Sequence, residues 1–354
     1  MMNETLPTRQ VIAGNVAIGG GAPVTVQTMT NTDTRDVPAT LAQIRAMAAA
    51  GADLVRVSVY DDACAAAVRD LVDGSPVPLV ADIHFDHRLA IRAVENGIAK
   101  VRINPGNIGG EAKVRALADC LKQHRVPVRI GVNSGSIEKD ILARYGGVTP
   151  EGMVESGLNH ARMLERAGFD DIVLSFKATD VRKMVAACRL AARSCAYPQH
   201  IGVTESGTAD VGVVKSAVGI GALLLDGIGD TIRVSLSGDP VQEVPAGLSI
   251  LRACGLRRDG IEIISCPTCG RTTIDVEGIA RRVRAETQDI KKPMKVAVMG
   301  CVVNGPGEAR EADLGIAGGG DGSGALFVRG EAPRKVTGDL AAALIAEIRR
   351  LAEP

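Results

Sequence analysis

The sequence has very few aromatic residues and no excess of charge of either sign. Of its 354 residues none is Trp, and aromatic side chains make up only 2%. Lys+Arg and Asp+Glu are equal at 41 each, so the molecule as a whole has no basic charge to attract nucleic acid. So few rings also leave little material for stacking nucleobases. These two absences argue against a nucleic-acid-binding protein.

Long apolar runs and a secretory leader are lacking as well. No stretch offers about 18 consecutive apolar residues, so the sequence predicts no membrane span. The N-terminal segment MMNETLPTRQ is polar and lacks the apolar core of a signal peptide. We therefore expect a cytoplasmic protein whose eight cysteines are thiols or metal ligands rather than disulfides. The hydrophobic content of 46% is that of a globular protein.

Residues 1–255 alternate between apolar segments rich in Val, Ile and Leu and segments with helical periodicity. Eight such strand–helix units predict a (β/α)8 barrel of the TIM type. A doubly wound open sheet is the alternative, and the number of units favours the barrel. The expected strands are Val24–Met29, Asp53–Val59, Val77–Asp82, Ile98–Ile103, Pro127–Val132, Asp171–Phe176, His200–Thr204 and Asp230–Leu236.

Apolar and polar residues alternate within several of these strands. In DLVRVSV, for example, Val55 and Val57 share one face, while Arg56 and Ser58 share the other. The apolar face must meet the surrounding helices, so the polar face points into the barrel. Five cations are thereby directed inward near the carboxyl ends of their strands, where barrel enzymes build their sites. They are Arg56, Arg102, Arg129, Lys177 and Arg233.

Five inward cations need counter-ions or an anionic ligand, because unpaired buried charges repel one another and lose hydration. Neutralisation by Asp82, Glu205 and other acids is one interpretation. The convergence of five cations favours the other, an anionic ligand, and the planar guanidinium group suits a phosphate or diphosphate. Asp82, His84 and Glu205 are also candidates for proton transfer.

The pattern changes after residue 255. Residues 256–354 are predicted to form a small α+β domain, in which GIEIISC and KVAVMGC are strands that each end in a cysteine. Neighbouring strand ends would bring Cys266, Cys269 and Cys301 together, and the nearest further donor in CVVNGPGEA is Glu308. The spacing alone leaves zinc, an iron–sulfur cluster and a redox disulfide open. The other five cysteines lie in or at the end of predicted helices and are expected to be buried apolar residues.

Taken in order, the motifs of the chain resemble those of one family from end to end. The chain is similar to the bacterial (E)-4-hydroxy-3-methylbut-2-enyl diphosphate synthases of the short form, which lack a domain inserted between barrel and C-terminal domain. The resemblance implies a diphosphate-binding barrel at 1–255 and an α+β domain with a [4Fe–4S] cluster at 256–354. The motifs are VQTMTNTDT, GADLVRVSV, ADIHFD, VRINPGN, RIGVNSGS, SFKAT, GVTESG, TIRVSLSGDP, SCPTCGR and CVVNGPGEA.

The resemblance also implies an activity and partners. The reaction is the reductive ring opening and dehydration of 2-C-methyl-D-erythritol 2,4-cyclodiphosphate to (E)-4-hydroxy-3-methylbut-2-enyl diphosphate, in the methylerythritol phosphate route to isoprenoids. Reduced flavodoxin or ferredoxin would supply two electrons. A head-to-tail homodimer would bring the cluster of one chain over the barrel of the other.

Residue roles follow from the same resemblance. Glu205 would supply or relay a proton, with Asp82 and Glu308 as further catalytic residues. A carboxylate exchanges on iron more readily than a thiolate, which would leave one iron open to substrate. The cluster ligands would be Cys266, Cys269, Cys301 and Glu308, and the substrate-binding residues Arg56, Arg102, Asn104, Arg129, Asn133, Lys177, Arg233, Ser235 and Ser237.

Two other classes of protein share part of this pattern. A phosphate-binding barrel of the pterin-synthase kind with a structural zinc domain explains the cations but not Glu308 after NGPG. A non-catalytic iron–sulfur carrier would predict a fourth cysteine and has no use for inward cations. Metal identity distinguishes the first from the synthase, and exchange of the fourth ligand distinguishes the second.

Overall fold

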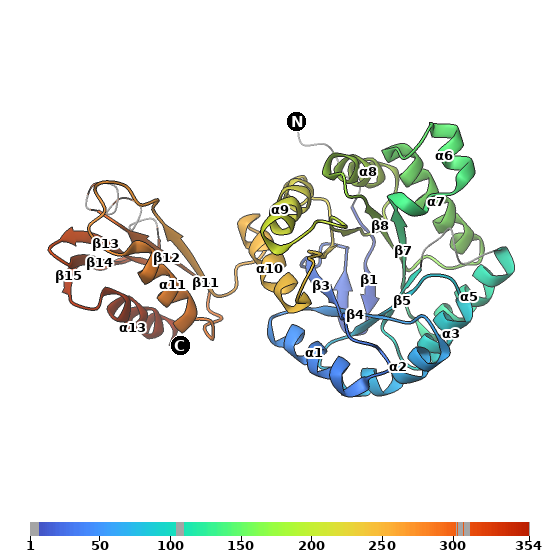
Figure 1. The fold of residues 1–354 in the computed structure, drawn as a ribbon, viewed down its shortest axis with the longest axis horizontal. Helices are drawn as coiled ribbons and strands as arrows, with labels where there is room; N and C mark the ends of the chain where they lie inside the picture. The colour runs from blue at the N-terminus through green and yellow to red at the C-terminus, as the bar shows by residue number, and fades with distance from the viewer. Residues whose placement is uncertain (1–6, 104–109, 302, 304–306, 308–311, 354) are drawn as a thin grey trace. The chain divides into compact units, whose positions relative to one another are not determined.

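The computed structural model describes residues 7–103, 110–301, 303, 307 and 312–353. The chain divides into two compact units, Met1–Arg257 and Arg258–Pro354 (Figure 1). The boundary expected from the sequence, between residues 255 and 256, lies close to this division. Each unit has its own apolar core, so each is described by itself.

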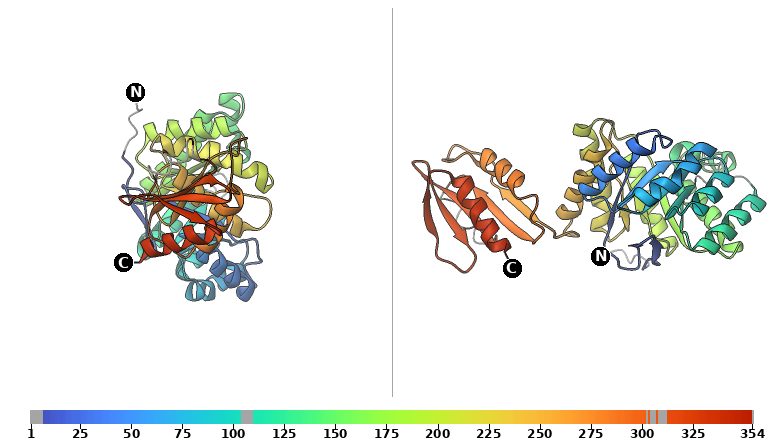
Figure 2. Two further views of the ribbon diagram at one scale, coloured as in Figure 1. Left: turned by 90° about the vertical axis from the view of Figure 1, so that its left-hand side faces the viewer. Right: turned by 90° about the horizontal axis from the view of Figure 1, so that it is seen from below.

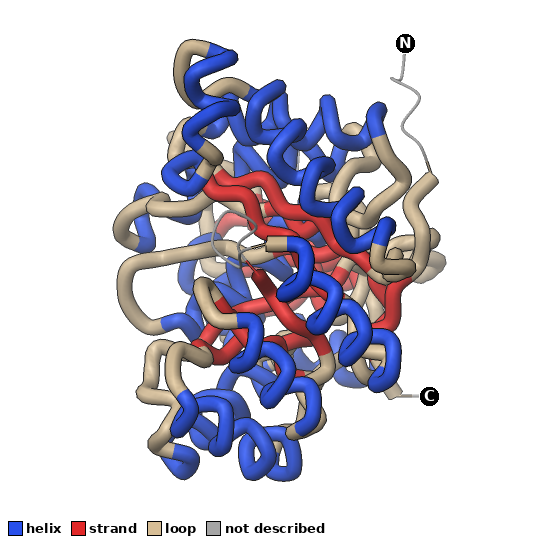
Figure 3. The backbone as a smooth tube through the Cα atoms, turned by 90° about the vertical axis from the view of Figure 1, so that its right-hand side faces the viewer, coloured by secondary structure: helices blue, strands red, loops and turns tan. Residues whose placement is uncertain are grey.

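The described part of the first unit contains eight parallel strands in the order β8-β7-β6-β5-β4-β3-β10-β9. The two ends of this order meet where Leu174 of β8 bridges Gln199, one residue before β9. Helices surround the strands on the outside (Figures 1 and 3), which confirms the predicted barrel. The strands are β3 Thr25–Met29, β4 Leu54–Ser58, β5 Leu79–Ile83, β6 Lys100–Ile103, β7 Val128–Asn133, β8 Ile172–Lys177, β9 His200–Ile201 and β10 Thr231–Ile232.

Several of the surrounding helices begin at a residue whose side chain caps them. Asp61 accepts a hydrogen bond from the Cys64 N–H at the start of α2, and Thr149 accepts one from the Gly152 N–H in α7, directly before Pro150. Their apolar faces pack on the outward valines and isoleucines of the strands. The helices are α1 Val37–Ala49, α2 Asp62–Gly74, α3 His87–Glu95, α5 Glu111–His124, α6 Lys139–Tyr145, α7 Pro150–Arg166, α8 Val181–Ser194, α9 Ala209–Leu225 and α10 Glu243–Ala253.

The last two barrel strands are shorter than the sequence predicts. The Arg233 N–H still donates to the Ile201 carbonyl at 3.0 Å. Beyond it, the Leu236 N–H donates to the carboxylate of Glu243, and the Ser237 N–H donates to the Gly207 carbonyl. The backbone therefore leaves the ladder to bond a side chain and a loop, which alternation in the sequence does not reveal.

A hairpin that the sequence did not predict precedes the barrel. It is formed by β1 (Val11–Ala13) and β2 (Val16–Ile18), which pair antiparallel. Ile18 and its neighbours in the hairpin form an apolar cluster with Leu54, Val80 and Val173. Because these three residues lie near the amino ends of their strands, the hairpin covers that end of the barrel.

The described part of the second unit contains a five-stranded sheet in the order β11-β12-β13-β14-β15. Strands β11 to β13 are parallel, and β13 to β15 are antiparallel. The helices α11 (Val276–Glu286) and α13 (Leu340–Ala352) share one apolar core with the sheet and lie beside it in Figure 2. The strands are β11 Ile261–Ser265, β12 Met294–Met299, β13 Leu314–Gly320, β14 Ser323–Val328 and β15 Arg334–Thr337.

This α+β architecture is the one predicted. None of the helices in the described parts of the chain has the length and apolar content that a membrane span requires.

Candidate functional site

A cavity of about 130 Å³ lies at the carboxyl end of the barrel. Eight of the residues predicted for the site line it: Arg56, Asp82, Arg102, Arg129, Asn133, Lys177, Arg233 and Ser235. His84, which the sequence identified as a candidate for proton transfer, lines it too, together with Ser175 and Thr204. The residues come from β4 to β8 and from the segments after β5, β9 and β10, so nearly the whole barrel contributes.

The strand register explains why these side chains converge. Asp82 of β5 lies opposite Arg102 of β6, which lies opposite Arg129 of β7. Ser58 of β4 is in turn opposite Asp82. Since alternate residues of each strand face the interior, neighbouring strands place their inward side chains at similar heights. The charged residues thus form a layer across the barrel.

Arg102 is held by an acid and a histidine. Its Nη1 donates to Asp82 Oδ1 at 2.9 Å and lies 2.9 Å from His84 Nε2. Gly131 makes room for this guanidinium, because a Cβ at that position would lie 2.6 Å from Arg102 Nε. Arg102 is therefore oriented by a buried counter-ion and by the absence of a side chain on the neighbouring strand.

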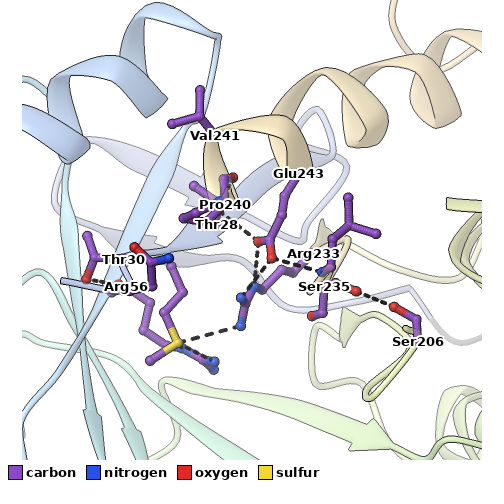
Figure 4. A network of polar contacts seen from close by, with 12 residues as sticks. Thr28, Thr30, Arg56, Ser206, Arg233, Ser235, Pro240, Val241 and Glu243 are labelled. Atoms are coloured by element: carbon purple, nitrogen blue, oxygen red, sulfur yellow. Dashed lines mark hydrogen bonds and ion pairs between the residues drawn. The ribbon is translucent and has the colours of Figure 1, made fainter. Parts of the chain in front are cut away.

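Arg56 and Arg233 have unequal partners. Arg56 donates from Nε and Nη2 to Met29 Sδ at 3.1 and 2.9 Å, and a thioether is a weak acceptor. Arg233 donates from Nε and Nη2 to the two carboxylate oxygens of Glu243, at 3.0 and 3.1 Å (Figure 4). Arg233 thus donates to a strong acceptor, the carboxylate of Glu243, whereas Arg56 donates to a weak acceptor, the thioether of Met29.

Several buried donors of the layer have no hydrogen-bond partner among the described residues. They are Arg129 Nε and Nη1, Arg102 Nε and Lys100 Nζ. Lys100 lies two residues before Arg102, on the same face of β6. Lys100 and Arg129 are almost completely buried. Buried donors without partners are costly, so this set favours a ligand rich in acceptors.

The electrostatics of the layer point the same way. Burial and the charge of Arg56 lower the pKa of both Lys177 and Arg129 well below their ordinary values. Burial lowers the pKa of Arg56 to about 10, although Asp82 opposes this shift. Among the residues that the structure describes, the buried acids in contact with the five predicted cations are Asp82 and Glu243. The layer therefore has an excess of positive charge that an anion would relieve.

Asp82 is an ionised counter-ion in this layer. Its burial raises the pKa, but the charge of Arg56, the hydrogen bond with His84 and the charge of Arg102 outweigh burial and hold the pKa well below its ordinary value. The carboxylate accepts from Arg102 and lies 3.7 Å from Arg56 Nε. It therefore pairs with both of these cations.

Two predicted residues of the barrel that the structure describes, Glu205 and Ser237, do not line the cavity. Glu205 is exposed, and its Oε2 accepts a hydrogen bond from Thr179 Oγ1 at 2.7 Å at the same end of the barrel. Its φ of 52° is in the left-handed region, which is rare for residues other than glycine and is often retained at functional sites. Ser237 is also exposed. Asn104 lies outside the described residues.

The second unit places two of the predicted cluster ligands at neighbouring strand ends. Cys266 follows β11 directly, and Cys301 follows β12 after one residue, with the two strands adjacent and parallel. The Gly300 N–H donates to Cys266 Sγ at 3.1 Å. Cys269 is exposed in the following turn, where its N–H donates to Thr272 Oγ1. Glu308 lies outside the described residues.

These residues fit an iron–sulfur cluster in the chemistry of their donors. Backbone N–H groups directed at sulfur stabilise thiolate ligands, and the Gly300 N–H does this at Cys266. In the described residues no three Cys, His, Asp or Glu side chains are gathered closely enough to hold a metal ion. A cavity of about 400 Å³ adjoins Cys266 and is bordered by Glu277, Arg281 and Arg284 of α11.

The remaining cysteines are in different surroundings. Burial raises the pKa of Cys188 to about 12, so its thiol is unreactive. Burial also raises the pKa of Cys64, Cys120, Cys195 and Cys254. This is the behaviour of small apolar residues, although only Cys64 and Cys188 are fully buried, and Cys120, Cys195 and Cys254 are half-buried.

Sequence reasoning did not identify the residues that support the layer. Glu243 begins a helix and looks like any acid in a first turn, and Met29 looks like any apolar residue at a strand end. Lys100, in contrast, shares its strand face with Arg102, so alternation could have included it. The hydrogen bonds of Thr28 to Glu243 and of Arg233 to Met29 join residues more than 200 positions apart in the sequence.

Known proteins match this chain over almost its whole length. The family model described as the GcpE TIM-barrel domain matches residues 8–248, and that described as the GcpE protein C-terminal domain matches residues 262–350. Two relatives are named 4-hydroxy-3-methylbut-2-en-1-yl diphosphate synthase (flavodoxin). The one from Geobacter sulfurreducens is 56% identical over 97% of this chain and 98% of its own. The one from Caldanaerobacter subterraneus subsp. tengcongensis is 55% identical over 92% of this chain and 91% of its own.

A more distant likeness concerns the barrel. The solved structure of 7,8-dihydropteroate synthase from Vibrio fischeri matches 70% of this chain and 97% of its own, with a TM-score of 0.50 and 14% identity. At this identity the match supports the barrel fold alone.

Proposed function

The chain belongs to the GcpE family, and we propose that it catalyses the reductive ring opening and dehydration of 2-C-methyl-D-erythritol 2,4-cyclodiphosphate to (E)-4-hydroxy-3-methylbut-2-enyl diphosphate. It is an oxidoreductase of the methylerythritol phosphate route to isoprenoids. The observation that carries this function to particular residues is the layer of buried cations at the carboxyl end of the barrel. A substrate with two linked phosphates supplies the acceptors and the negative charge that this layer lacks.

The diphosphate is bound by the cations of the layer. Arg129 has two buried donor groups without partners among the described residues, and Arg56 donates to a thioether that a phosphate oxygen would replace at a gain. Lys177 adds a point charge, and Arg102 and Arg233, which line the same cavity, add their guanidinium groups. Asn133 and Ser235, in the same lining, bind polar groups of the ring. Asn104 and Ser237 are assigned to substrate by the resemblance.

The charge excess of the layer suits the reaction. The cyclic diphosphate takes up two electrons and one proton, its ring C–O bond breaks, and water and a linear diphosphate are formed. The phosphate oxygen that leaves carbon gains negative charge, so the product is more negative than the substrate. Fixed cations in a buried site stabilise charge that develops in this way.

Glu205 supplies or relays the proton in this proposal. Its carboxylate is exposed at the carboxyl end of the barrel, and its strained backbone holds it there. Replacing Glu205 with Gln should slow turnover at least about tenfold while leaving the Kd for substrate unchanged. The amide has the same size as the carboxylate, but it does not donate or accept a proton in the reaction. Unchanged turnover would remove Glu205 from the mechanism.

Cys266, Cys269, Cys301 and Glu308 would hold the [4Fe–4S] cluster. When bound, such a cluster supplies single electrons and a Lewis-acidic iron. The electron donor is flavodoxin, named with the relatives, or a ferredoxin. The proposal also includes a cytoplasmic location and a head-to-tail homodimer in which the cluster of one chain serves the barrel of the other. A monomer with full activity at high dilution would contradict the dimer.

The function is tested on anaerobically purified protein by iron, acid-labile sulfide and zinc analysis, followed by turnover of the cyclodiphosphate with reduced flavodoxin. We expect about four irons and four sulfides per chain and formation of the linear diphosphate. Stoichiometric zinc without sulfide, with failed reconstitution by iron and sulfide, would contradict the proposal. It would favour a phosphate-binding barrel with a structural zinc domain.

A further inference from the structure

Glu243 is a buried acid to which the proposed chemistry gives no role. It is the first residue of α10, and it is only 2% exposed. Its two carboxylate oxygens accept four hydrogen bonds, drawn in Figure 4. The donors are Thr28 Oγ1 at 2.9 Å, Arg233 Nε at 3.0 Å, Arg233 Nη2 at 3.1 Å and the Leu236 N–H at 3.1 Å.

The two bonds to Arg233 restrict the guanidinium to one orientation. Both carboxylate oxygens take part, one on Nε and one on Nη2, which is the parallel two-bond geometry that fixes an arginine most firmly. Arg233 Nη1 is left with Met29 Sδ at 3.6 Å, a long contact with a weak acceptor. Arg233 is thus bound along one edge and has donors available along the other, beside the cavity that it lines.

The other two bonds fix the carboxylate itself. Thr28 belongs to β3, which is adjacent to β10, and its hydroxyl also lies 3.3 Å from the Pro240 carbonyl. Leu236 belongs to the segment after β10, and its N–H donates to the same oxygen as Arg233 Nη2. Glu243 therefore connects a neighbouring barrel strand, the segment that follows Arg233 and the start of α10. Such a carboxylate cannot move without breaking several buried bonds.

We propose that Glu243 is a positioning residue of the diphosphate site, which fixes the free edge of Arg233 toward the ligand. This inference rests on the proposed function, because it assigns Arg233 to the diphosphate. Glu243 touches no substrate in this account. It acts through Arg233, and the cost of burying its negative charge is offset by the two-bond pair and the helix N-terminus.

If Glu243 acted only through its charge, its loss would change the affinity for an anion in the opposite direction, which makes the proposal testable. If Glu243 served only to neutralise Arg233, the loss of its charge would make the cavity more positive, and an anion would bind more tightly. If Glu243 positions Arg233, the loss of its charge frees the guanidinium and an anion binds more weakly. The direction of the change in affinity therefore decides between the two roles.

The test uses Glu243→Gln in the intact chain and inorganic diphosphate as the probe, measured by isothermal titration calorimetry. Gln keeps the volume and two of the acceptor contacts but not the charged pair. We expect diphosphate to bind about tenfold more weakly, and in turnover assays the KM to rise with little change in kcat. The matched control is Glu347→Gln, which removes a second buried glutamate paired with Arg334 and Arg350 in the other unit. It should cost stability without affecting diphosphate binding.

A double-mutant cycle shows whether Glu243 acts through Arg233. Arg233→Met and the double variant with Glu243→Gln should bind diphosphate with the same Kd, because the positioning residue has nothing left to position. Thr28→Val gives a second, uncharged change, removing one anchor of the carboxylate. It should also weaken diphosphate binding, by about threefold. Thr28→Val therefore tests the proposal even if Glu243→Gln fails to fold.

The possible results separate this inference from the proposed function. Tighter or unchanged binding in Glu243→Gln, or additive effects in the cycle, would overturn the positioning role and leave the diphosphate site intact. Failure of the wild-type protein to bind diphosphate would overturn the assignment of the cations to that ligand, and the inference with it. Weaker binding with non-additive effects supports both.

Discussion

The two ends of the barrel interior are built from the same strands but have opposite chemistry. In β4, Leu54 faces the interior at the amino end, and Arg56 faces it two positions later. In β5, Val80 is followed in the same way by Asp82. At the amino end these apolar residues pack against the β1–β2 hairpin. At the carboxyl end the same strand faces carry charges that line a cavity.

This difference separates stability from function within one barrel. The amino end is a dry apolar cluster, whose burial favours folding. The carboxyl end buries like charges and, in the part of the chain that the structure describes, donors without partners, and both oppose folding. Barrels in general place catalytic groups at the carboxyl end and stabilising groups at the amino end. Changes at the two ends should therefore affect different measurements.

The largest effect is expected for Arg129→Met at the charged end. Diphosphate binding should weaken at least about a hundredfold, roughly 3 kcal/mol, because two buried donors for phosphate oxygens are lost. The free energy of unfolding without ligand should not fall, because Arg129 is desolvated among like charges. Calorimetric titration and denaturant unfolding measure the two quantities. If the variant lost stability and kept its affinity for diphosphate, Arg129 would serve folding rather than binding, contrary to the comparison of the two ends.

The opposite outcome is expected for Val80→Ala at the apolar end. Val80 is completely buried against the hairpin, so the change should lower the free energy of unfolding by about 2 kcal/mol. The Kd for diphosphate should stay within about twofold of the wild-type value, since the backbone of β5 is unchanged. Urea unfolding and titration at a temperature where the variant is folded check both. A large loss of affinity would show that the two ends are coupled.

Gly131→Ala should sharpen the comparison within the charged layer. A methyl group there would lie 2.6 Å from Arg102 Nε and displace the guanidinium from Asp82. We expect about tenfold weaker diphosphate binding with little loss of stability, because the flexible side chain can move. Gly135→Ala is the matched control, since its methyl group meets nothing within 4 Å. Equal affinities of the two variants would mean that the position of Arg102 is unimportant.

The smallest effect concerns pH and Lys177. Burial and nearby arginines lower its pKa in the folded protein, so between the folded and the unfolded pKa the unfolded chain binds more protons. Stability without ligand should therefore rise as pH increases toward about 10.4, the ordinary pKa of lysine. Lys177→Met should lose that part of the rise. Identical pH profiles of stability for the two proteins would show that Lys177 is not strained by its surroundings.

Alternation was sufficient to predict most of the barrel and its charged layer. Arg56, Arg102, Arg129, Lys177 and Arg233 were placed inside because each shares a strand face with polar residues opposite an apolar face, and all five line the cavity. This works because a strand buried on its outer side can direct only the other face inward. The two-residue period is a local property, so one sequence reveals it.

Contacts distant in sequence could not be predicted in this way. The pair between Thr28 and Glu243 joins residues 215 positions apart, and nothing near either residue signals it. The hairpin at the amino end is also absent from the predicted strands, because three-residue strands carry too little pattern. The strand expected at Asp230–Leu236 ends at Ile232, and further along the segment Glu243 takes the Leu236 N–H. Local pattern thus identified the cations, and tertiary contacts determine how they are held.

The central claim is that the charged carboxyl end of the barrel binds the diphosphate of the substrate. A crystal structure of the intact chain with 2-C-methyl-D-erythritol 2,4-cyclodiphosphate tests it most directly. The account predicts both phosphates in the cavity, with their oxygens within hydrogen-bond distance of Arg56, Arg129 and Lys177 and with Arg233 still paired to Glu243. A diphosphate bound elsewhere, with the donors of Arg129 satisfied by water alone, would contradict it.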